Sequence, residues 1–497
     1  MNNHKVWKKV KRSEIPKNRR CVKCKWVFKI KRNGKFRARL VACGYSQIPG
    51  VDFTENYSPV IHDISARILI IIMIIYGLEG KLVDVETAFL YGDLEEEVYM
   101  DCPEGMVDIA EDEALLLQST IYGLVQSARQ YYKKATSILK ELGFTGGTVD
   151  PCLFYRETEK GKVYFGLYVD DNLLIGDPQA IEQAINELKE KGLVLKVDDN
   201  LNNYLSCDIR FSEKKNKAWI GQPHLIANLQ DKFGDKVSKL RNYVTPGTPS
   251  LSIVRNPLQE VSISQEDHKL YRSGVGMLLY LVKYSRPDIA NPVRELSKVL
   301  DAPTPASFKE MLRVIKYVLD TKEYGLRVHP TKEKDECWEL VCFCDSNYAG
   351  DPDTRKSVTG YVLYVKGVPV CWKSKAQRSV TLSSTEAEWI ALSEATKEII
   401  FVLQLLESLE IKVNLPITVR VDNTGAIFMS KNINTTSGTK HVDVRTKYVN
   451  QYCEDGVVKI VFVESANNDA DILTKNLGQE LHNKHSNKLI SDKNQAF

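Results

Sequence analysis

The sequence predicts a mixed α+β and α/β protein built from several domains. A chain of 497 residues is too long for one ordinary domain, so we expect two to four. Short apolar runs alternate with helical stretches, and 43% of the residues are hydrophobic, as in globular proteins. Acidic residues stand at the ends of predicted strands in two separate regions. These observations indicate two sites on a multidomain scaffold.

The N-terminal region is strongly basic, although the net charge of the whole chain is only +4. From Met1 to Tyr45 the one acid is Glu14. Such a stretch is a common footprint for a phosphate backbone, and a solubilising tail is the equal alternative. Residues 26–31 and 36–41 read as two strands joined by a turn at Asn33-Gly34. We therefore expect a basic hairpin near the N-terminus.

The stretch from Ile68 to Ile75 is intensely apolar but too short for a membrane span, which needs about 20 residues. We interpret it as a buried helix packed under a strand at 81–85. The N-terminus is charged and shows no signal peptide. The 11 cysteines have no framework spacing, which indicates reduced thiols in an intracellular compartment.

A short polar break between two apolar runs is the most informative segment. Residues 163–167 and 173–175 read as a hairpin, and the break holds Tyr168-Val169-Asp170-Asp171. Side chains alternate along a strand, but a tight turn lets both aspartates approach one point. Two buried carboxylates repel strongly unless a cation neutralises them. The segment predicts a divalent metal site, most simply for Mg²⁺, while a solvated turn is the alternative for this segment taken alone.

A third acid, Asp84, lies near the end of the strand at 81–85, and residues 84–90 read DVETAFL. Together with YVDD, this stretch resembles the reverse transcriptases of copia-type long-terminal-repeat retrotransposons, which carry DVxTAFLxGDL. The resemblance implies a right-hand polymerase with fingers, palm and thumb, in which Asp84, Asp170 and Asp171 hold two metal ions. It also implies that Phe89 packs against the nucleotide sugar and selects deoxynucleotides.

The basic hairpin carries the next part of the resemblance. Residues 38–45, ARLVACGY, are similar to the KARLVAKGY of these enzymes. Polymerases of this class place such a hairpin over the incoming nucleotide. The resemblance therefore implies that Arg39, together with Lys31 and Arg37, contacts the triphosphate, and a charged solvent face is the alternative for any one of them.

Residues 121–129, IYGLVQSAR, resemble the family's LYGLKQxPR element, which contacts nucleotide and template. The resemblance implies binding roles for Gly123 and Gln126. The chain departs from the pattern at Val125, where the family has lysine, and at Ala128, where it has proline. These departures predict reduced nucleotide binding or a changed helix entry and not a different mechanism, because the three aspartates are present.

A second set of acids follows a strand-rich region near the C-terminus. Strands are expected at 338–345, 359–365, 368–373, 417–421 and 458–463, with a helix from 383 past 406 and another opening at 469. Hydroxyls and acids at 383–388 are typical of a helix start. This order of elements, with acids at their ends, is the ribonuclease H arrangement.

The motifs of this region also resemble copia-type elements. Residues 344–351, CDSNYAGD, are similar to CDADWAGD, and residues 383–392, 440–445 and 470–475 are similar to SSTEAEYIAL, KHIDIR and ADIFTK. Carried over, Asp345, Glu388, Asp422 and Asp471 bind two Mg²⁺ and cleave the RNA of an RNA–DNA hybrid. Glu388 is chosen over Glu386 because it lies on the side of the apolar stripe formed by Leu392, Ala395, Ile399, Val402 and Leu406.

The Pro-Gly-rich segment at 245–249 is the strongest linker signal. With helices at 179–191, 224–233, 271–284 and 308–319, it leads us to expect the following domains: a basic arm at 1–20, the reverse transcriptase at 21–245, a connection segment at 246–336, an RNase H-like domain at 337–478 and a polar tail at 479–497.

The sequence thus predicts an RNA-directed DNA polymerase with ribonuclease H activity. The cofactors expected are two Mg²⁺ per active site, with Mn²⁺ as an alternative. The partners expected are an RNA template, a DNA primer, RNA–DNA hybrid and dNTPs, with a homodimer or other element-encoded proteins left open and no membrane. The expected location is cytoplasmic, in a virus-like particle, or nuclear. The alternative function is a non-catalytic nucleic-acid-binding remnant of a decayed or domesticated element.

Overall fold

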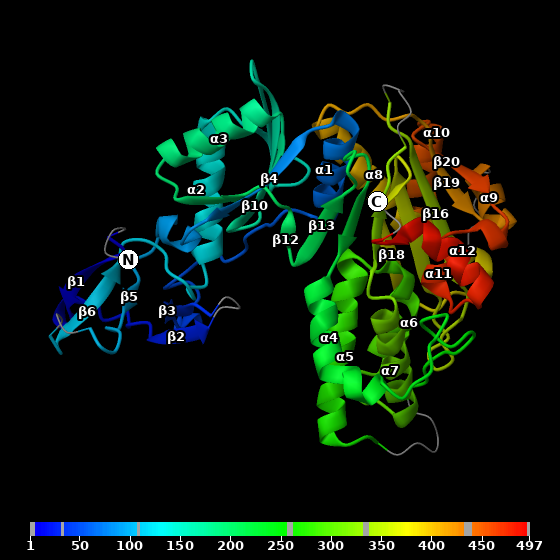
Figure 1. The fold of residues 1–497 in the computed structure, drawn as a ribbon, viewed down its shortest axis with the longest axis horizontal. Coiled ribbons are helices and arrows are strands. Elements are labelled where there is room, and N and C mark those ends of the chain that lie inside the picture. Colours follow the sequence, from blue (N-terminus) through cyan, green and yellow to red (C-terminus); the bar gives the residue numbers. More distant parts are fainter. Residues whose placement is uncertain are drawn as a thin grey trace. The chain divides into compact units, whose positions relative to one another are not determined.

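The computed structural model describes residues 5–30, 34–106, 110–255, 262–331, 337–431 and 440–494. The chain divides into two compact units (Figure 1). Unit 1 comprises residues 1–62 and 79–200, and unit 2 comprises residues 63–78 and 201–497. The mixed α/β, multidomain fold class is confirmed.

Unit 1 is built on an antiparallel six-stranded sheet of order β11-β4-β10-β9-β8-β7. Helix α3 packs on β9 and β10. The expected hairpin around the YVDD turn is confirmed, because β9 and β10 pair antiparallel on either side of it. The elements of this sheet and its helices are β4 (Glu79–Val85), α2 (Ser127–Glu141), β7 (Thr145–Gly146), β8 (Leu153–Thr158), β9 (Gly161–Gly166), β10 (Asp171–Gly176), α3 (Pro178–Glu190) and β11 (Leu195–Asp198).

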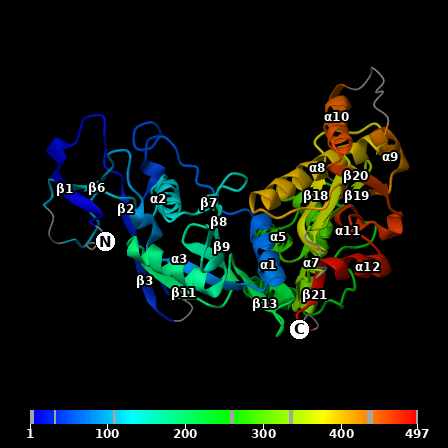
Figure 2. The ribbon, with the colours of Figure 1, turned by 90° about the horizontal axis from the view of Figure 1, so that it is seen from above.

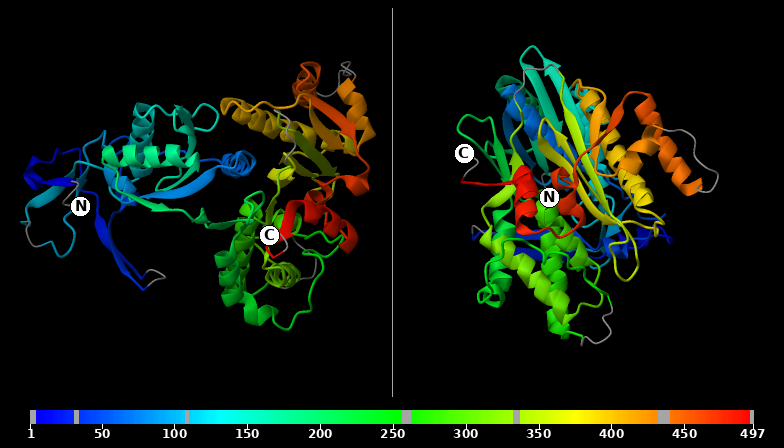
Figure 3. Two further views of the ribbon diagram at one scale, coloured as in Figure 1. Left: turned by 45° about the horizontal axis from the view of Figure 1, so that its top comes forward. Right: turned by 90° about the vertical axis from the view of Figure 1, so that its right-hand side faces the viewer.

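The N-terminal hairpin is a two-stranded ribbon that extends away from the rest of unit 1 (Figure 3, left, blue). Its strands pair antiparallel from Cys24 opposite Ala42 to Ile30 opposite Phe36, so the expected hairpin is confirmed. A second small sheet has the order β1-β6-β5. These elements are β1 (Trp7–Lys11), β2 (Cys24–Ile30), β3 (Phe36–Ala42), β5 (Tyr99–Met100) and β6 (Glu113–Leu117).

Unit 2 contains a helical layer whose core joins α4, α5, α6 and α7 (Figure 1, green). Leu229, Phe233 and Val275 are fully buried in it. Gly274 allows α5 and α7 to approach closely, because a Cβ there would meet Met311 Sδ at 2.6 Å. These helices are α4 (Pro223–Val237), α5 (Gln265–Tyr284), α6 (Ala290–Ser297) and α7 (Pro305–Asp320).

The second sheet of unit 2 has the order β18-β17-β16-β19-β20. Strands β16, β17 and β18 pair antiparallel, whereas β19 pairs parallel with β16 and with β20. This is the ribonuclease H-like arrangement expected from the sequence, and α8 lies along one face of it (Figure 2). The elements are β16 (Leu340–Asn347), β17 (Val358–Val365), β18 (Val368–Ala376), α8 (Ser384–Ser408), β19 (Ile417–Val421), α9 (Thr424–Lys431), α10 (Lys440–Glu454), β20 (Val458–Phe462) and α11 (Asp471–Thr474).

The two faces of this sheet are covered by different helices. The Tyr361 hydroxyl donates to Glu398 of α8 at 3.3 Å. The neighbouring residue, Gly360, faces α11, because a Cβ there would meet Thr474 Cγ2 at 2.5 Å. Adjacent residues of a strand point to opposite faces, so α8 and α11 cover opposite faces of β17.

The C-terminal segment from residue 479 was expected to be a polar tail, and the sequence left open whether it is folded; the structure shows a helix there. Helix α12 (Gln479–Leu489) buries His482, His485 and Leu489. It is followed by β21 (Ile490–Asp492), which pairs with β15 (Tyr324–Val328). The two strands pair over three residues, and this pairing completes a sheet of order β12-β13-β14-β15-β21. The other strands of the sheet are β12 (Asn202–Tyr204), β13 (Cys207–Phe211) and β14 (Ala218–Gly221). The buried residues of α12 recur at helical spacing and three of the four are polar (His482, His485, Ser486 and Leu489), so composition alone did not reveal the helix.

The apolar segment at 68–75 is a buried helix, as expected, but its packing partner is different. Helix α1 (Asp63–Tyr76) belongs to unit 2, where it packs against β18, whereas the strand that carries Asp84 belongs to unit 1. The Arg67 guanidinium donates to the backbone oxygens of Val370 at 2.8 Å and Lys283 at 2.6 Å. Its Cζ atom also lies 4.2 Å from the ring centroid of Trp372. These contacts attach the helix to the second unit.

The expected linker at 245–249 lies inside unit 2 and is not a boundary between the units. Thr245 is 3% exposed, and Arg313 Nη2 donates to its hydroxyl at 3.1 Å. Residues 201–245, expected to end the reverse transcriptase domain, also belong to unit 2. Within the described residues, no helix combines the length and apolar character needed to span a membrane.

Candidate metal centres

In unit 1, strand pairing places two of the predicted metal ligands side by side. Asp171, the first residue of β10, is the register partner of Asp84 on β4. Partner Cα atoms in an antiparallel pair lie about 4.5–5.5 Å apart. The amide of Val85 donates to the carbonyl oxygen of Asp170 at 3.0 Å. The pairing therefore brings Asp84, Asp170 and Asp171 to one end of the central strands.

The turn before β10 has an unusual backbone. Val169 has φ 49°, a left-handed conformation that is rare for a β-branched residue. The Asp171 amide donates to the Tyr168 carbonyl at 2.9 Å and closes the turn. Asn172 is 1% exposed and donates to the carbonyl of Val83 at 3.1 Å. These contacts fix the direction in which the two turn aspartates leave the backbone.

The electrostatics of the three aspartates are those of crowded carboxylates. Desolvation, followed by the negative charges of Asp170 and Asp84, raises the pKa of Asp171 to about 6. Desolvation and Asp170 also raise the pKa of Asp84, and Lys196 and Arg37 oppose this rise. In the described part of the chain, the three carboxylates do not form a group with all ligand oxygens within 4.8 Å of one another. A bound cation would draw them closer by relieving their repulsion.

Phe89 and Arg39 meet at Tyr122, a residue to which the sequence reasoning gave no role. The rings of Phe89 and Tyr122 pack edge to face with centroids 5.1 Å apart. The Arg39 guanidinium lies over the Tyr122 ring, with its Cζ atom 4.7 Å from the ring centroid. Arg37, Arg39 and Tyr122 are among the residues that line a cavity of about 530 Å³. This arrangement supplies positive charge and a stacking surface in one place.

The other predicted binding residues differ in their accessibility. Gly123 packs against the end of β3, because a Cβ there would meet the carbonyl oxygen of Ala42 at 2.1 Å. Gln126 is 1% exposed; its side chain accepts from Gln47 Nε2 at 3.0 Å and donates to the Asp52 carbonyl at 2.8 Å. Through these contacts, Gly123 and Gln126 pack against neighbouring parts of the protein and stabilise the local structure. Lys31 lies outside the described residues.

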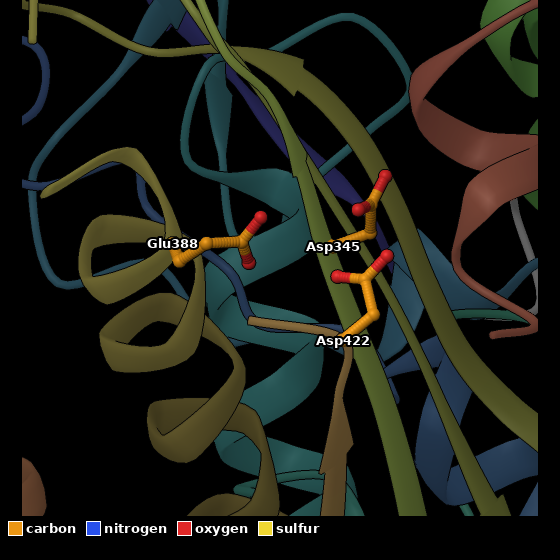
Figure 4. Close-up of side chains that lie close together, drawn as sticks. All are labelled: Asp345, Glu388 and Asp422. Atoms are coloured by element: carbon orange, nitrogen blue, oxygen red, sulfur yellow. The ribbon is translucent and has the colours of Figure 1, made fainter. Parts of the chain in front are cut away.

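In unit 2, three predicted ligands converge on one point. The carboxylates of Asp345, Glu388 and Asp422 each offer an oxygen, and these oxygens all lie within 4.8 Å of one another. Asp345 is inside β16, Asp422 follows the end of β19, and Glu388 points from α8 towards both (Figure 4). The alternative acid, Glu386, instead accepts from the Leu382 amide at 2.7 Å.

The fourth predicted ligand, Asp471, is connected to Asp345 of this group by Lys475, which contacts both acids. Lys475 Nζ lies 3.0 Å from Asp471 Oδ2 and 3.8 Å from Asp345 Oδ2. The Thr474 hydroxyl donates to the same Asp345 oxygen. Asn468 Nδ2 donates to the Cys344 carbonyl at 3.0 Å and ties the loop before α11 to β16. The sequence reasoning assigned no role to Asn468 or Lys475, although the family motif at 470–475 includes the lysine.

Burial perturbs these acids strongly. Desolvation, followed by the charge of Asp345, raises the pKa of Glu388 to about 9, and bonds from Ser346 oppose the rise. Desolvation and Asp345 raise the pKa of Asp471 to about 7. Desolvation also raises the pKa of Asp345, and the positive charge of Lys475 opposes this. The raised pKa values of Glu388, Asp471 and Asp345 favour their protonated forms when no cation is bound.

The residues of unit 2 fit a hard divalent cation. Two buried oxygens, Glu388 Oε2 and Asp471 Oδ1, have no hydrogen-bond partner among the described residues. Unpaired buried oxygens are costly, and carboxylate oxygens are the ligands that Mg²⁺ prefers. His441, considered as a substitute for a missing product-release histidine, lies in α10, but its side chain is outside the described residues.

Comparison with known proteins agrees with the geometry. Residues 4–242 match the family described as reverse transcriptase (RNA-dependent DNA polymerase). The chain is 33% identical over 95% of its length to the retrovirus-related Pol polyprotein from transposon TNT 1-94 of Nicotiana tabacum, covering 36% of that protein. It is 30% identical over 94% of its length to the corresponding polyprotein from transposon RE1 of Arabidopsis thaliana, covering 31%. It thus spans about a third of the length of these curated relatives.

A solved structure of the foamy viral protease-reverse transcriptase in complex with double-stranded DNA is also similar, with a TM-score of 0.44 and 12% identity over 92% of this chain and 67% of that chain.

These findings define a chain of the reverse transcriptase class that carries an RNase H-like domain. More specifically, the chain belongs to the Pol polyprotein region of copia-type long-terminal-repeat retrotransposons, and the resemblance inferred from its motifs is confirmed.

Proposed function

We propose that this chain is an active RNA-directed DNA polymerase whose second site cleaves the RNA strand of RNA–DNA hybrids. The observation that carries the proposal is the presence of two separate acidic clusters, one in each compact unit. A copy that no longer functions accumulates substitutions at ligand positions as readily as at other positions. Every expected carboxylate is nevertheless present in this chain.

In unit 1, the proposed roles follow from position. Asp84, Asp170 and Asp171 hold Mg²⁺, which when bound activates the primer hydroxyl and stabilises the leaving pyrophosphate. Arg37 and Arg39 bind the triphosphate with their positive charge. Tyr122 holds Arg39 and Phe89 in place, so that the Phe89 ring limits the space beside the sugar.

In unit 2, Asp345, Glu388, Asp422 and Asp471 are the proposed ligands for hybrid cleavage. Ser346 orients Glu388, because its amide and hydroxyl donate to Glu388 Oε1 at 3.1 and 2.9 Å. Thr474 orients Asp345 in the same way. The substrates proposed are RNA template, DNA primer, dNTPs and RNA–DNA hybrid.

Primer extension on an RNA template with Mg²⁺ tests the polymerase. We expect DNA product from the unmodified chain and essentially none from Asp170→Asn. The control is Asp198→Asn, which changes an exposed carboxylate on β11 and leaves synthesis intact. Absence of product from the unmodified chain, or equal product from Asp170→Asn, refutes the polymerase proposal and favours a nucleic-acid-binding remnant.

Hybrid cleavage tests the second site independently. Asp345→Asn abolishes cleavage and leaves primer extension unchanged, whereas Glu386→Gln, on the first turn of α8, retains both activities. If both activities fell together in Asp345→Asn, the division into two sites would be wrong.

A further inference from the structure

The ammonium group of Lys475 lies between two acids that are proposed to share a metal. It is 3.0 Å from Asp471 Oδ2 and 3.8 Å from Asp345 Oδ2. Asp345 and Asp471 are 2% and 4% exposed, so their charges are poorly screened by solvent. A positive charge at these distances from two buried carboxylates stabilises their negative charges, as a bound cation would.

The contacts divide the four acids into two groups that share Asp345. Asp345, Glu388 and Asp422 offer oxygens within 4.8 Å of one another. Among the described residues, no lysine or arginine forms an ion pair with Glu388 or Asp422, whereas Lys475 contacts Asp345. The second group is the pair Asp345 and Asp471, and Lys475 contacts both acids.

We propose that Lys475 is a built-in counter-ion that competes with the second divalent cation of the nuclease site. The first cation binds at Asp345, Glu388 and Asp422, where Lys475 contacts only Asp345, at 3.8 Å. The second must move the ammonium group away from Asp345 and Asp471. Lys475 has the freedom to leave, because its side chain is 38% exposed and sits on a long flexible stem. This inference rests on the metal-dependent nuclease proposed above.

The position of Lys475 in the sequence motif at 470–475 is consistent with this role. Lys475 follows Asp471 by four residues, immediately after the short helix α11. Thr474, between them, donates to Asp345. The same short segment thus supplies one metal ligand, a hydrogen bond to a second ligand, and the competing charge.

Metal binding to the full chain tests the proposal. The three polymerase aspartates are changed to asparagine, so that only the nuclease site binds, and Mg²⁺ is titrated by calorimetry. In this background Lys475→Met tightens the second, weaker binding step by about tenfold or more and changes the first step much less. Lys475→Arg keeps the charge and leaves the second step close to its original affinity. Lys397→Met, an exposed lysine paired with Glu394 on α8, changes neither step.

Thermal unfolding separates competition from a merely structural role. In EDTA, Lys475→Met melts below the parent chain, because Asp345 and Asp471 lose their counter-charge, and saturating Mg²⁺ closes that gap. A gap that persists at saturating Mg²⁺, or a second step unaffected by Lys475→Met, overturns the inference while leaving the nuclease proposal standing. If a folded chain bound no Mg²⁺ in any variant, both would fall.

Discussion

At the scale of single residues, the position of Phe89 is fixed by contacts with neighbouring residues, because Phe89 does not lie in a strand. Its ring packs against Tyr122, and its carbonyl oxygen accepts from the Thr120 hydroxyl. We predict that Phe89→Ala lowers discrimination against ribonucleotides by about tenfold or more, because the space beside the sugar opens. The measurement is kcat/KM for a dNTP and the matching rNTP on one primer and template.

The control for this prediction is Phe28→Ala. Phe28 is 76% exposed on the ribbon, so its removal leaves sugar discrimination as it was. Equal discrimination by Phe89→Ala and the unmodified chain would show that another group excludes the 2′-hydroxyl.

The raised pKa of Glu388 leads us to expect that the proposed nuclease site is sensitive to pH. Its pKa is raised from 4.5 to about 9, so it is largely protonated at neutral pH and Mg²⁺ must displace the proton. We predict that Mg²⁺ affinity rises from pH 7 to 9 and that binding releases protons, measured by calorimetry in two buffers of different ionisation enthalpy. Affinity that does not change with pH would contradict the perturbed acid.

The same shift sets how stability depends on pH without Mg²⁺. Between pH 4.5 and about 9 the folded chain holds a proton on Glu388 that the unfolded chain releases. Stability therefore falls as pH rises through this window. Glu388→Gln removes this part of the slope, which unfolding titrations at pH 6 and pH 9 in EDTA measure.

At the scale of elements, hydrophobic periodicity was sufficient to predict most of the scaffold. The apolar stripe of α8 placed Glu388 and not Glu386 on the sheet side, and Glu388 is 5% exposed beside Asp345. The end of β19 just before Asp422 and the hairpin around YVDD also follow from local pattern. Such signals succeed because burial of one face dictates the residue spacing.

What periodicity could not predict depends on contacts between distant segments. The positive φ of Val169 is maintained by its surroundings, including Asn172, and no local preference of valine indicates it. The approach of Lys475 to Asp345 requires the loop before α11 to dock on β16 through Asn468. These are tertiary effects that a single sequence does not encode as a pattern.

Helix α1 shows the limit most clearly. It is buried on nearly all sides, so it has no apolar stripe to indicate which sheet it covers. Its one buried charge, Arg67, provides the attachment to β18. We predict that Arg67→Met destabilises the chain by about 2–4 kcal/mol, because two backbone oxygens lose charged donors. Denaturant unfolding measures the loss.

A matched variant distinguishes this contact from a general effect of arginine loss. Arg272→Met changes an exposed arginine on α5 and shifts stability by less than about 0.5 kcal/mol. Similar behaviour of the two variants would mean that the Val370 and Lys283 contacts of Arg67 contribute little.

At the scale of the whole molecule, the two compact units are not consecutive in the chain. Unit 1 is interrupted by residues 63–78, which fold with unit 2. A linear division at 245, drawn from the Pro-Gly-rich segment, therefore separates α1 from β18, its packing partner. Local composition detects a turn, but it does not reveal which elements pack on each other across the chain.

This interruption predicts how fragments behave. Residues 1–200 expressed alone contain α1 without β18, so the apolar side chains from Ile64 to Ile74 that are buried in the full chain become exposed. We predict that this fragment aggregates, and that co-expression with residues 201–497 yields a soluble pair that purifies together. Size-exclusion chromatography with light scattering measures both. A fragment of residues 1–200 that is monodisperse alone would show that α1 finds cover within unit 1, and that its assignment to unit 2 is not what stabilises it.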